Sequence, residues 1–239
     1  MERRDITSMG DVNLEKGEYG NISCAGDLKI SGAIKAISIK SAGDMKAQED
    51  VEVDKLTVFG DATFRKNLKA TEISVYGDGD FQGKLTGQEV KIYGSLTAGT
   101  IEAEEITVNG ELEKAQEVSA EKIILNGEFH VEGAMNIGHG IFNLGGDSRV
   151  KEIFCEVLEV NVGNNSYQGM LAGLISRGKG GTLKVELIEG DEIHLQNTRA
   201  DIVRGKTVRI GAGSKIGKVE YSDTLEIFDG GIVEIKEEF

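Results

Sequence analysis

The sequence predicts an all-β protein, a parallel β-helix with a triangular cross-section in which each turn is one repeat of about 17 residues. Three observations predict this fold. Glycine recurs at a nearly constant spacing, apolar residues recur in pairs two positions apart, and the chain of 239 residues contains no proline. Because proline lacks a backbone donor and is confined to sheet edges, its absence is typical of strands that are paired on both sides.

The repeat is marked by a glycine that follows a short apolar strand and precedes an acidic or polar residue. The segments Leu-Thr-Val-Phe-Gly60-Asp and Ile-Ser-Val-Tyr-Gly77-Asp, for example, align without gaps. From Gly26 to Gly127, the intervals between successive glycines are 17, 17, 17, 17, 16 and 17. We assign nine glycines to this corner of the coil: Gly10, Gly26, Gly43, Gly60, Gly77, Gly94, Gly110, Gly127 and Gly146.

Apolar residues occupy three pairs of positions in each repeat. Counted from the glycine, the pairs lie at −4 and −2, at +2 and +4, and at +8 and +10. A spacing of two is strand periodicity, so each repeat is expected to form three short strands, one on each face. Parallel turns about 4.8 Å apart stack the inward positions into columns. The column at −4 reads Ile22, Ile39, Leu56, Ile73, Val90, Ile106 and Ile123.

Two rows of outward positions flank the corner. The position after the glycine carries Asp27, Asp44, Asp61, Asp78, Ser95, Glu111 and Glu128. We expect each acid to cap the turn that it follows; a cation-binding stripe or a face that repels lateral bundling is the alternative. The position before the glycine carries Phe59, Tyr76 and Tyr93. These rings are expected to stack between turns, with a lateral contact patch as the alternative.

The repeat divides the chain into three parts. Residues 1–162 follow the regular β-helix, residues 163–181 form an inserted loop or short helix, and residues 182–239 continue the β-helix in looser register. The insertion lacks acidic residues and carries apolar residues at helical spacing. It is expected to pack over the coil or to contact a membrane or partner through Tyr167, Met170, Leu171, Leu174 and Ile175.

Composition and motifs argue against several functions. A net charge of −14, with no evident cluster of Lys and Arg, disfavours nucleic acid binding. Cys24 and Cys155 lack metal-ligand spacing and are expected to be buried, reduced thiols. The first residues lack a signal peptide and no stretch is apolar enough to span a membrane, so a cytoplasmic location is expected.

The chemistry of enzymes is weakly represented. His130 falls at an outward position with no second ligand or nucleophile beside it. The segment Ile210–Gly217 matches the hexapeptide pattern of left-handed β-helix acyltransferases for only two units. Gly178–Gly181 lacks the Lys-Ser ending of a phosphate loop. We therefore predict no catalytic, metal, cofactor or nucleotide site.

The repeat length, the strand-Gly-Asp corners and the closing stretch Val208–Ile227 resemble the bactofilins, the polymer-forming cytoskeletal proteins of bacteria, and most of all their longer Gram-positive forms. The resemblance implies a right-handed β-helix that polymerises end to end without nucleotide. It also implies a scaffolding role in cell shape, envelope synthesis or motility, with membrane or cell-envelope proteins as further partners. We expect no counterpart here of the proline-rich tails and the apolar N-terminal anchor that many members have.

The ends of a β-helix give an independent reason to expect self-association. Each end leaves an unpaired strand edge and an open apolar cross-section unless a cap covers it. We predict that the ends stack between copies through Ile6, Val12, Leu14, Leu225, Ile227, Phe228 and Ile232. The alternatives are a non-polymerising adaptor that docks a partner through the aromatic row or the 163–181 segment and, less favoured, an acyltransferase-type enzyme.

Overall fold

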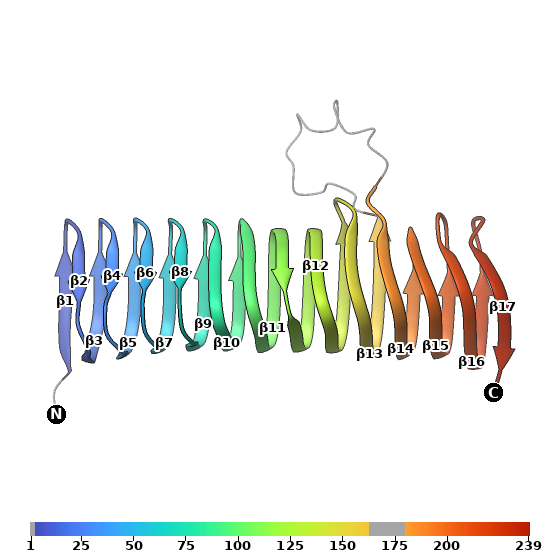
Figure 1. Cartoon of the computed structure of the whole chain (residues 1–239), viewed down its shortest axis with the longest axis horizontal. Coiled ribbons are helices and arrows are strands. Elements are labelled where there is room, and N and C mark those ends of the chain that lie inside the picture. Colours follow the sequence, from blue (N-terminus) through green and yellow to red (C-terminus); the bar gives the residue numbers. More distant parts are fainter. Residues whose placement is uncertain (1–2, 163–179) are drawn as a thin grey trace. The chain divides into compact units, whose positions relative to one another are not determined.

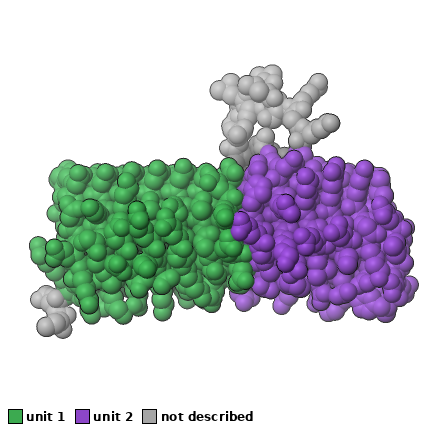
Figure 2. All heavy atoms as spheres, viewed as in Figure 1, with its two compact units in different colours: residues 1–120 green, residues 121–239 purple. Residues whose placement is uncertain are grey.

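The computed structural model describes residues 3–162 and 180–239, which contain strands and no helix. The chain divides into two compact units, unit 1 (Met1–Ala120) and unit 2 (Glu121–Phe239), coloured green and purple in Figure 2. The strands are β1 (Arg4–Ser8), β2 (Val12–Leu14), β3 (Gly17–Cys24), β4 (Leu28–Ile30), β5 (Ile34–Ser41), β6 (Met45–Ala47), β7 (Val51–Val58), β8 (Ala62–Phe64), β9 (Leu68–Val75), β10 (Gly79–Ile92), β11 (Ser95–Ala115), β12 (Glu117–Leu144), β13 (Ser148–Val162), β14 (Leu183–Leu195), β15 (Thr198–Ile210), β16 (Lys215–Ile227) and β17 (Ile232–Glu238).

Unit 1 is a parallel β-helix, as the sequence predicts. Each long strand pairs with the long strand of the next turn, in the order β1, β3, β5, β7 and β9, and the short strands β2, β4, β6 and β8 pair in the same way (Figure 1). All of these pairs are parallel. Leu56 lies opposite Ile73, for example, so one full repeat along the chain corresponds to one turn.

The prediction of three strands per turn is wrong for the first turns, which contain two. In β5 the side chains of Ile34, Ala36, Ile39 and Ser41 are buried, and Ile37 and Ser38 between them point outward. These two successive outward residues bend the strand at the corner between positions +10 and −4 of the repeat, which we call the third corner. The strand does not end there, because no turn residue interrupts the hydrogen bonds to the next strand. In β10, β11 and β12 further corners lie within the strands, which are 14, 21 and 28 residues long.

The core of unit 1 consists of stacked columns of apolar side chains. The predicted column Ile22, Ile39, Leu56, Ile73, Val90 and Ile106 is at most 1% exposed. A second column places the rings of Phe64 and Phe81 in a stacked pair, with centroids 5.3 Å apart. Each fully buried aliphatic or aromatic side chain contributes about 1.5–3 kcal/mol of hydrophobic stabilisation relative to an exposed one.

The corner glycines are required by close approach between turns. A Cβ atom built at Gly60 would lie 2.4 Å from the Asp44 carboxylate and 2.8 Å from the Gly43 carbonyl carbon of the preceding turn. Gly43 and Gly77 are equally crowded, and none of the three has a positive φ. Gly10 has no preceding turn beneath it, and its Cβ would meet nothing within 4 Å.

Unit 2 has the same architecture in β13, β14, β15, β16 and β17, each paired in parallel with the next. Its turns vary in length, because Leu183 lies opposite Thr198, an interval of 15, whereas Val208 lies opposite Leu225, an interval of 17. Thr198 and Ala200 are the buried pair, whereas Ile202 is half-buried at the bend that follows.

We expect Gly60→Ala to lower the free energy of unfolding by about 2–3 kcal/mol, because the new methyl group must displace the backbone of the preceding corner. Gly10→Ala is the matched control and should change stability by less than about 0.5 kcal/mol. Urea denaturation followed by circular dichroism measures both. Equal effects of the two substitutions would show that inter-turn crowding is not the reason for glycine at these corners.

Candidate self-association surfaces

The first strand of unit 1 has one free hydrogen-bonding edge. β1 pairs through its other edge with β3, placing Ile6 opposite Ile22 and Ser8 opposite Cys24, and with no second strand of the described residues. Ile6 is half-buried. In β3, the ring of Tyr19 lies against Gly17, and the Tyr19 hydroxyl donates a hydrogen bond of 2.9 Å to the Glu15 carbonyl.

The last turn of unit 2 is likewise only partly paired. Leu225 and Ile227 of β16 lie opposite the buried Val208 and Ile210 of the preceding turn and are half-buried. β17 covers β16 only from Lys215 to Tyr221. The stretch from Leu225 to Ile227 therefore has one free edge with respect to the described residues, and its apolar side chains lack the turn that would bury them fully.

The rest of the last turn is less apolar. Val233 continues an inward column above Ala200 and Ile216, but the next column, Val203 and Val219, ends on Lys236. A charged residue at an inward position blocks further strand pairing. The half-buried apolar residues that continue inward columns at this end are thus Leu225, Ile227 and Val233.

The seven residues predicted to form the end surfaces differ in how well they are placed for it. Val12 and Leu14 are only 9% and 4% exposed in the single chain, because the narrow core lets neighbouring side chains cover them. Phe228 packs against the outer surface of unit 2, where its ring lies 5.6 Å from the ring of His194 and 5.9 Å from the Arg209 guanidinium. Ile232 lies opposite Lys215 in an outward row, away from the core. Of the seven, only Ile6, Leu225 and Ile227 are half-buried on a strand segment with a free edge.

The acids that follow the corner glycines form an ordered row, which we call the aspartate row: Asp11, Asp27, Asp44, Asp61 and Asp78. In each, Oδ1 accepts a hydrogen bond of 2.8–3.0 Å from the backbone N–H of the equivalent residue one turn further along the chain. The prediction that each acid caps its own turn is therefore wrong. These carboxylates bridge consecutive turns, since the corners approach each other so closely.

The predicted aromatic row is present in unit 1. The rings of Phe59 and Tyr76, and of Tyr76 and Tyr93, lie with centroids 5.0 Å apart and interplanar angles of 9° and 4°. All three side chains are exposed. Because each ring stacks on its neighbour, the row presents ring edges and hydroxyl groups to the outside.

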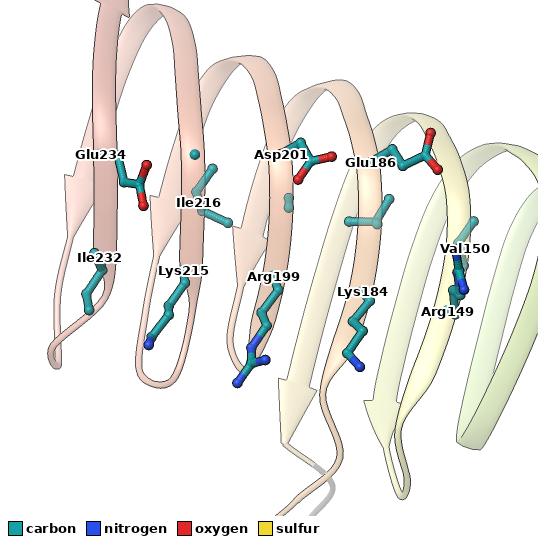
Figure 3. A pocket seen from close by; sticks show the side chains of 13 residues that line it. Arg149, Val150, Lys184, Glu186, Arg199, Asp201, Lys215, Ile216, Ile232 and Glu234 are labelled. Atoms are coloured by element: carbon teal, nitrogen blue, oxygen red, sulfur yellow. The ribbon is translucent and has the colours of Figure 1, made fainter.

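A row of basic side chains runs across unit 2 where the sequence indicated none. Arg149, Lys184, Arg199 and Lys215, which we call the basic row, are direct partners on four successive strands (Figure 3). They border a groove of about 750 Å³, whose other side carries Glu186, Asp201 and Glu234. The interpretation that no cluster of Lys and Arg exists is corrected here. The insertion separates Arg149 from Lys184 in the chain, so only the strand register brings them together.

Elsewhere on unit 2, several outward cations are paired with nearby acids. Arg204 contacts Glu189 at 2.8 Å and Glu220 at 2.6 Å, and Lys218 contacts Glu220 at 2.6 Å. These partners lower the pKa of Glu220, chiefly through the hydrogen bond from Lys218 and then that from Arg204. The network therefore stabilises the folded state near neutral pH and loses its contribution as the pH falls through the lowered pKa of Glu220.

The candidate chemical groups of unit 2 have different surroundings. Cys155 is half-buried, and burial followed by the charge of Asp191 raises the pKa of its thiol to about 12. His130 points outward, with Nε2 3.8 Å from a Glu128 oxygen. The acyltransferase-like segment Ile210–Gly217 forms a corner between β15 and β16, where Gly213 has a φ of 73°. His194 lies beneath Phe228, and its Nε2 is buried without a hydrogen-bond partner in the part of the chain that the structure describes.

The expected contact residues Tyr167, Met170, Leu171, Leu174 and Ile175 lie outside the described residues. Within residues 3–162 and 180–239, no helix has the length and apolar character needed to cross a membrane.

The chain resembles parts of two curated proteins. It is 49% identical to the uncharacterized protein YhbF of Bacillus subtilis (strain 168) over 55 residues, which are 23% of each chain. It is 41% identical to the uncharacterized protein YhbE of the same organism over 93 residues, 38% of this chain and 37% of YhbE. The matched segments thus span well under half of either relative. No family model and no solved structure matches the chain.

We expect Asp44→Ala to lower the free energy of unfolding by about 1 kcal/mol, because the Asp61 N–H loses its acceptor. Asp44→Asn keeps an acceptor oxygen and removes one of a series of stacked like charges, so it should cost less or stabilise. Urea titrations at low and high salt compare the two variants. An asparagine variant as unstable as the alanine variant would contradict the role assigned to the inter-turn hydrogen bond.

Neither thiol should react with a thiol reagent in the folded protein at pH 8. A pKa of about 12 leaves roughly one Cys155 thiol in 10⁴ ionised at that pH, and Cys24 is only 3% exposed. Ellman's reagent should detect both thiols after unfolding in urea, which serves as the control. Rapid labelling of the native chain would contradict the packing described for the two residues.

Proposed function

We propose that this protein is a structural scaffold that self-assembles end to end, without nucleotide, into filaments. One observation carries the proposal. Each unit has a strand segment with a free edge, and both segments occupy the same positions of the repeat. Ile6 and Ser8 stand four and two positions before a corner glycine, and Leu225 and Ile227 continue the equivalent column above Val208 and Ile210.

Matching positions favour a head-to-tail junction. If β1 of one copy pairs with the Leu225–Ile227 segment of another, the junction continues the column as if one more turn had been added. Backbone hydrogen bonds supply the affinity in this kind of strand addition, and burial of Ile6, Leu225 and Ile227 supplies the apolar contact. A junction between two identical ends would instead pair β1 with β1 in antiparallel orientation, which would not continue the parallel stacking of the turns.

The wider biological role follows from the resemblance to bactofilins. A nucleotide-independent polymer of this kind would serve as a cytoskeletal scaffold in cell shape, envelope synthesis or motility, in the cytoplasm or at the membrane. The resemblance rests on the repeat length and the strand-Gly-Asp corners. The similarity of parts of the chain to YhbF and YhbE of Bacillus subtilis is compatible with such a role but names no function.

A non-polymerising adaptor is the second candidate, because the aromatic row leaves three neighbouring rings exposed on unit 1. Such a protein would sediment as a single sharp species at all concentrations. Substitution of Tyr76 would then abolish partner binding and leave sedimentation unchanged.

We expect the purified chain to pellet on ultracentrifugation without nucleotide or metal and to form filaments in negative-stain micrographs. Leu225→Asp and Ile227→Asp should each raise the critical concentration about tenfold or more, because a charge is buried in the apolar junction. The matched control is Ile37→Asp, which changes an outward isoleucine of unit 1 that is 42% exposed. Filaments of normal length from both end variants would contradict the proposed junction.

A further inference from the structure

We propose that the basic row of one copy binds the aspartate row of a second copy, so that copies also associate side by side. This contact involves neither β1 nor the Leu225–Ile227 segment. It therefore goes beyond the proposed end-to-end assembly and does not depend on it.

The basic row has no ion-pair partner among the residues that the structure describes. Arg149, Lys184, Arg199 and Lys215 make no ion pair with any described residue, whereas the nearby Arg204, Lys206, Arg209 and Lys218 all do. Like charges on directly adjacent strands repel each other. Four stacked cations in a chain of net charge −14 therefore form a site for an external row of negative charge.

The aspartate row of unit 1 is preorganised for such a contact. Each Oδ1 is held by the backbone N–H of the next turn, which fixes the carboxylate and leaves its second oxygen without a hydrogen bond to the described residues. Asp11, Asp27, Asp61 and Asp78 are exposed and Asp44 is half-buried. Because these residues stand at a corner of the coil, they form a ridge, and the basic row borders a groove of about 750 Å³.

The two rows also match in spacing. Each takes one residue per turn, and parallel turns are separated by about 4.8 Å in both units. Four cations can therefore face four of the five carboxylates, one per turn, without any side chain leaving its row. A binding partner with a different repeat could satisfy only some of the cations.

A second pair of rows has the same complementarity. Across the groove from the basic row lie Glu186, Asp201 and Glu234. Two positions after Asp27 and Asp44 lie Lys29 and Lys46, which are neighbours on adjacent strands, exposed, and without an ion pair to any described residue. A contact that places cations against the aspartate row can thus place Lys29 and Lys46 against the acidic side of the groove. That acidic side would repel a uniform polyanion or an anionic membrane, so we favour a second copy as the partner.

The test uses the full chain with Leu225→Asp, which blocks the end junction, and measures self-association by sedimentation equilibrium. Side-by-side association should be detectable at about 50 mM salt and at least tenfold weaker at about 500 mM, because exposed charges are screened. Reversal of the basic row (Arg149→Glu, Lys184→Glu, Arg199→Glu and Lys215→Glu) should abolish it. A control of equal charge change reverses four exposed lysines outside both rows and both ends: Lys40, Lys66, Lys69 and Lys122.

A charge-swap experiment separates a specific contact from loss of folding or a general change of charge. The triple variant Asp27→Lys, Asp44→Lys and Asp61→Lys should not self-associate, but mixing it with the basic-row reversal should restore a heterodimer. Circular dichroism checks that both variants are folded.

Three results would overturn the inference: a monomeric Leu225→Asp chain at about 100 μM and low salt, association unaffected by reversal of the basic row, or row-dependent binding of polyphosphate or anionic vesicles by a chain that stays monomeric. Failure of the end-to-end proposal would be seen separately, as identical assembly with and without Leu225→Asp.

Discussion

Close stacking of each turn on the one before it is the constraint on which the other features depend. Paired strands fix the rise of a turn at about 4.8 Å, and at the corners this brings the backbones of consecutive turns into contact. A Cβ at Gly43 or Gly77 would lie within 2.9 Å of the preceding corner, so these positions are restricted to glycine. The same approach places each aspartate carboxylate within reach of the next turn's N–H. Proline has no place in strands that are paired on both edges.

Much of this could be predicted from the sequence because a solenoid converts spacing along the chain directly into contact. Leu56 and Ile73 stand at the same position of the repeat, and they are opposite each other in the structure. The aromatic row was predictable for the same reason. The unbroken third corner was not, because two outward residues such as Ile37 and Ser38 separate apolar pairs in the sequence whether or not the strand ends between them.

The surfaces were harder to predict than the core. The basic row depends on Arg149 lying opposite Lys184 across an insertion, and its other members follow at unequal intervals along the chain. No fixed period reveals these contacts. The end residues show a different difficulty, because apolar character does not say which way a side chain points. Ile232 lies in an outward row, and Phe228 folds onto Arg209 and His194.

The variable length of the turns has a consequence for how such a protein can change over evolution. The interval between opposed residues is 15 from Leu183 to Thr198, 17 from Leu56 to Ile73 and 19 from Val131 to Val150, yet the inward columns stay aligned. Single-residue insertions and deletions are therefore absorbed locally at bends. Gain or loss of a whole turn would lengthen or shorten every outward row by one side chain. Duplication of turns could thus adjust the number of charges in a row stepwise, without redesign of the core.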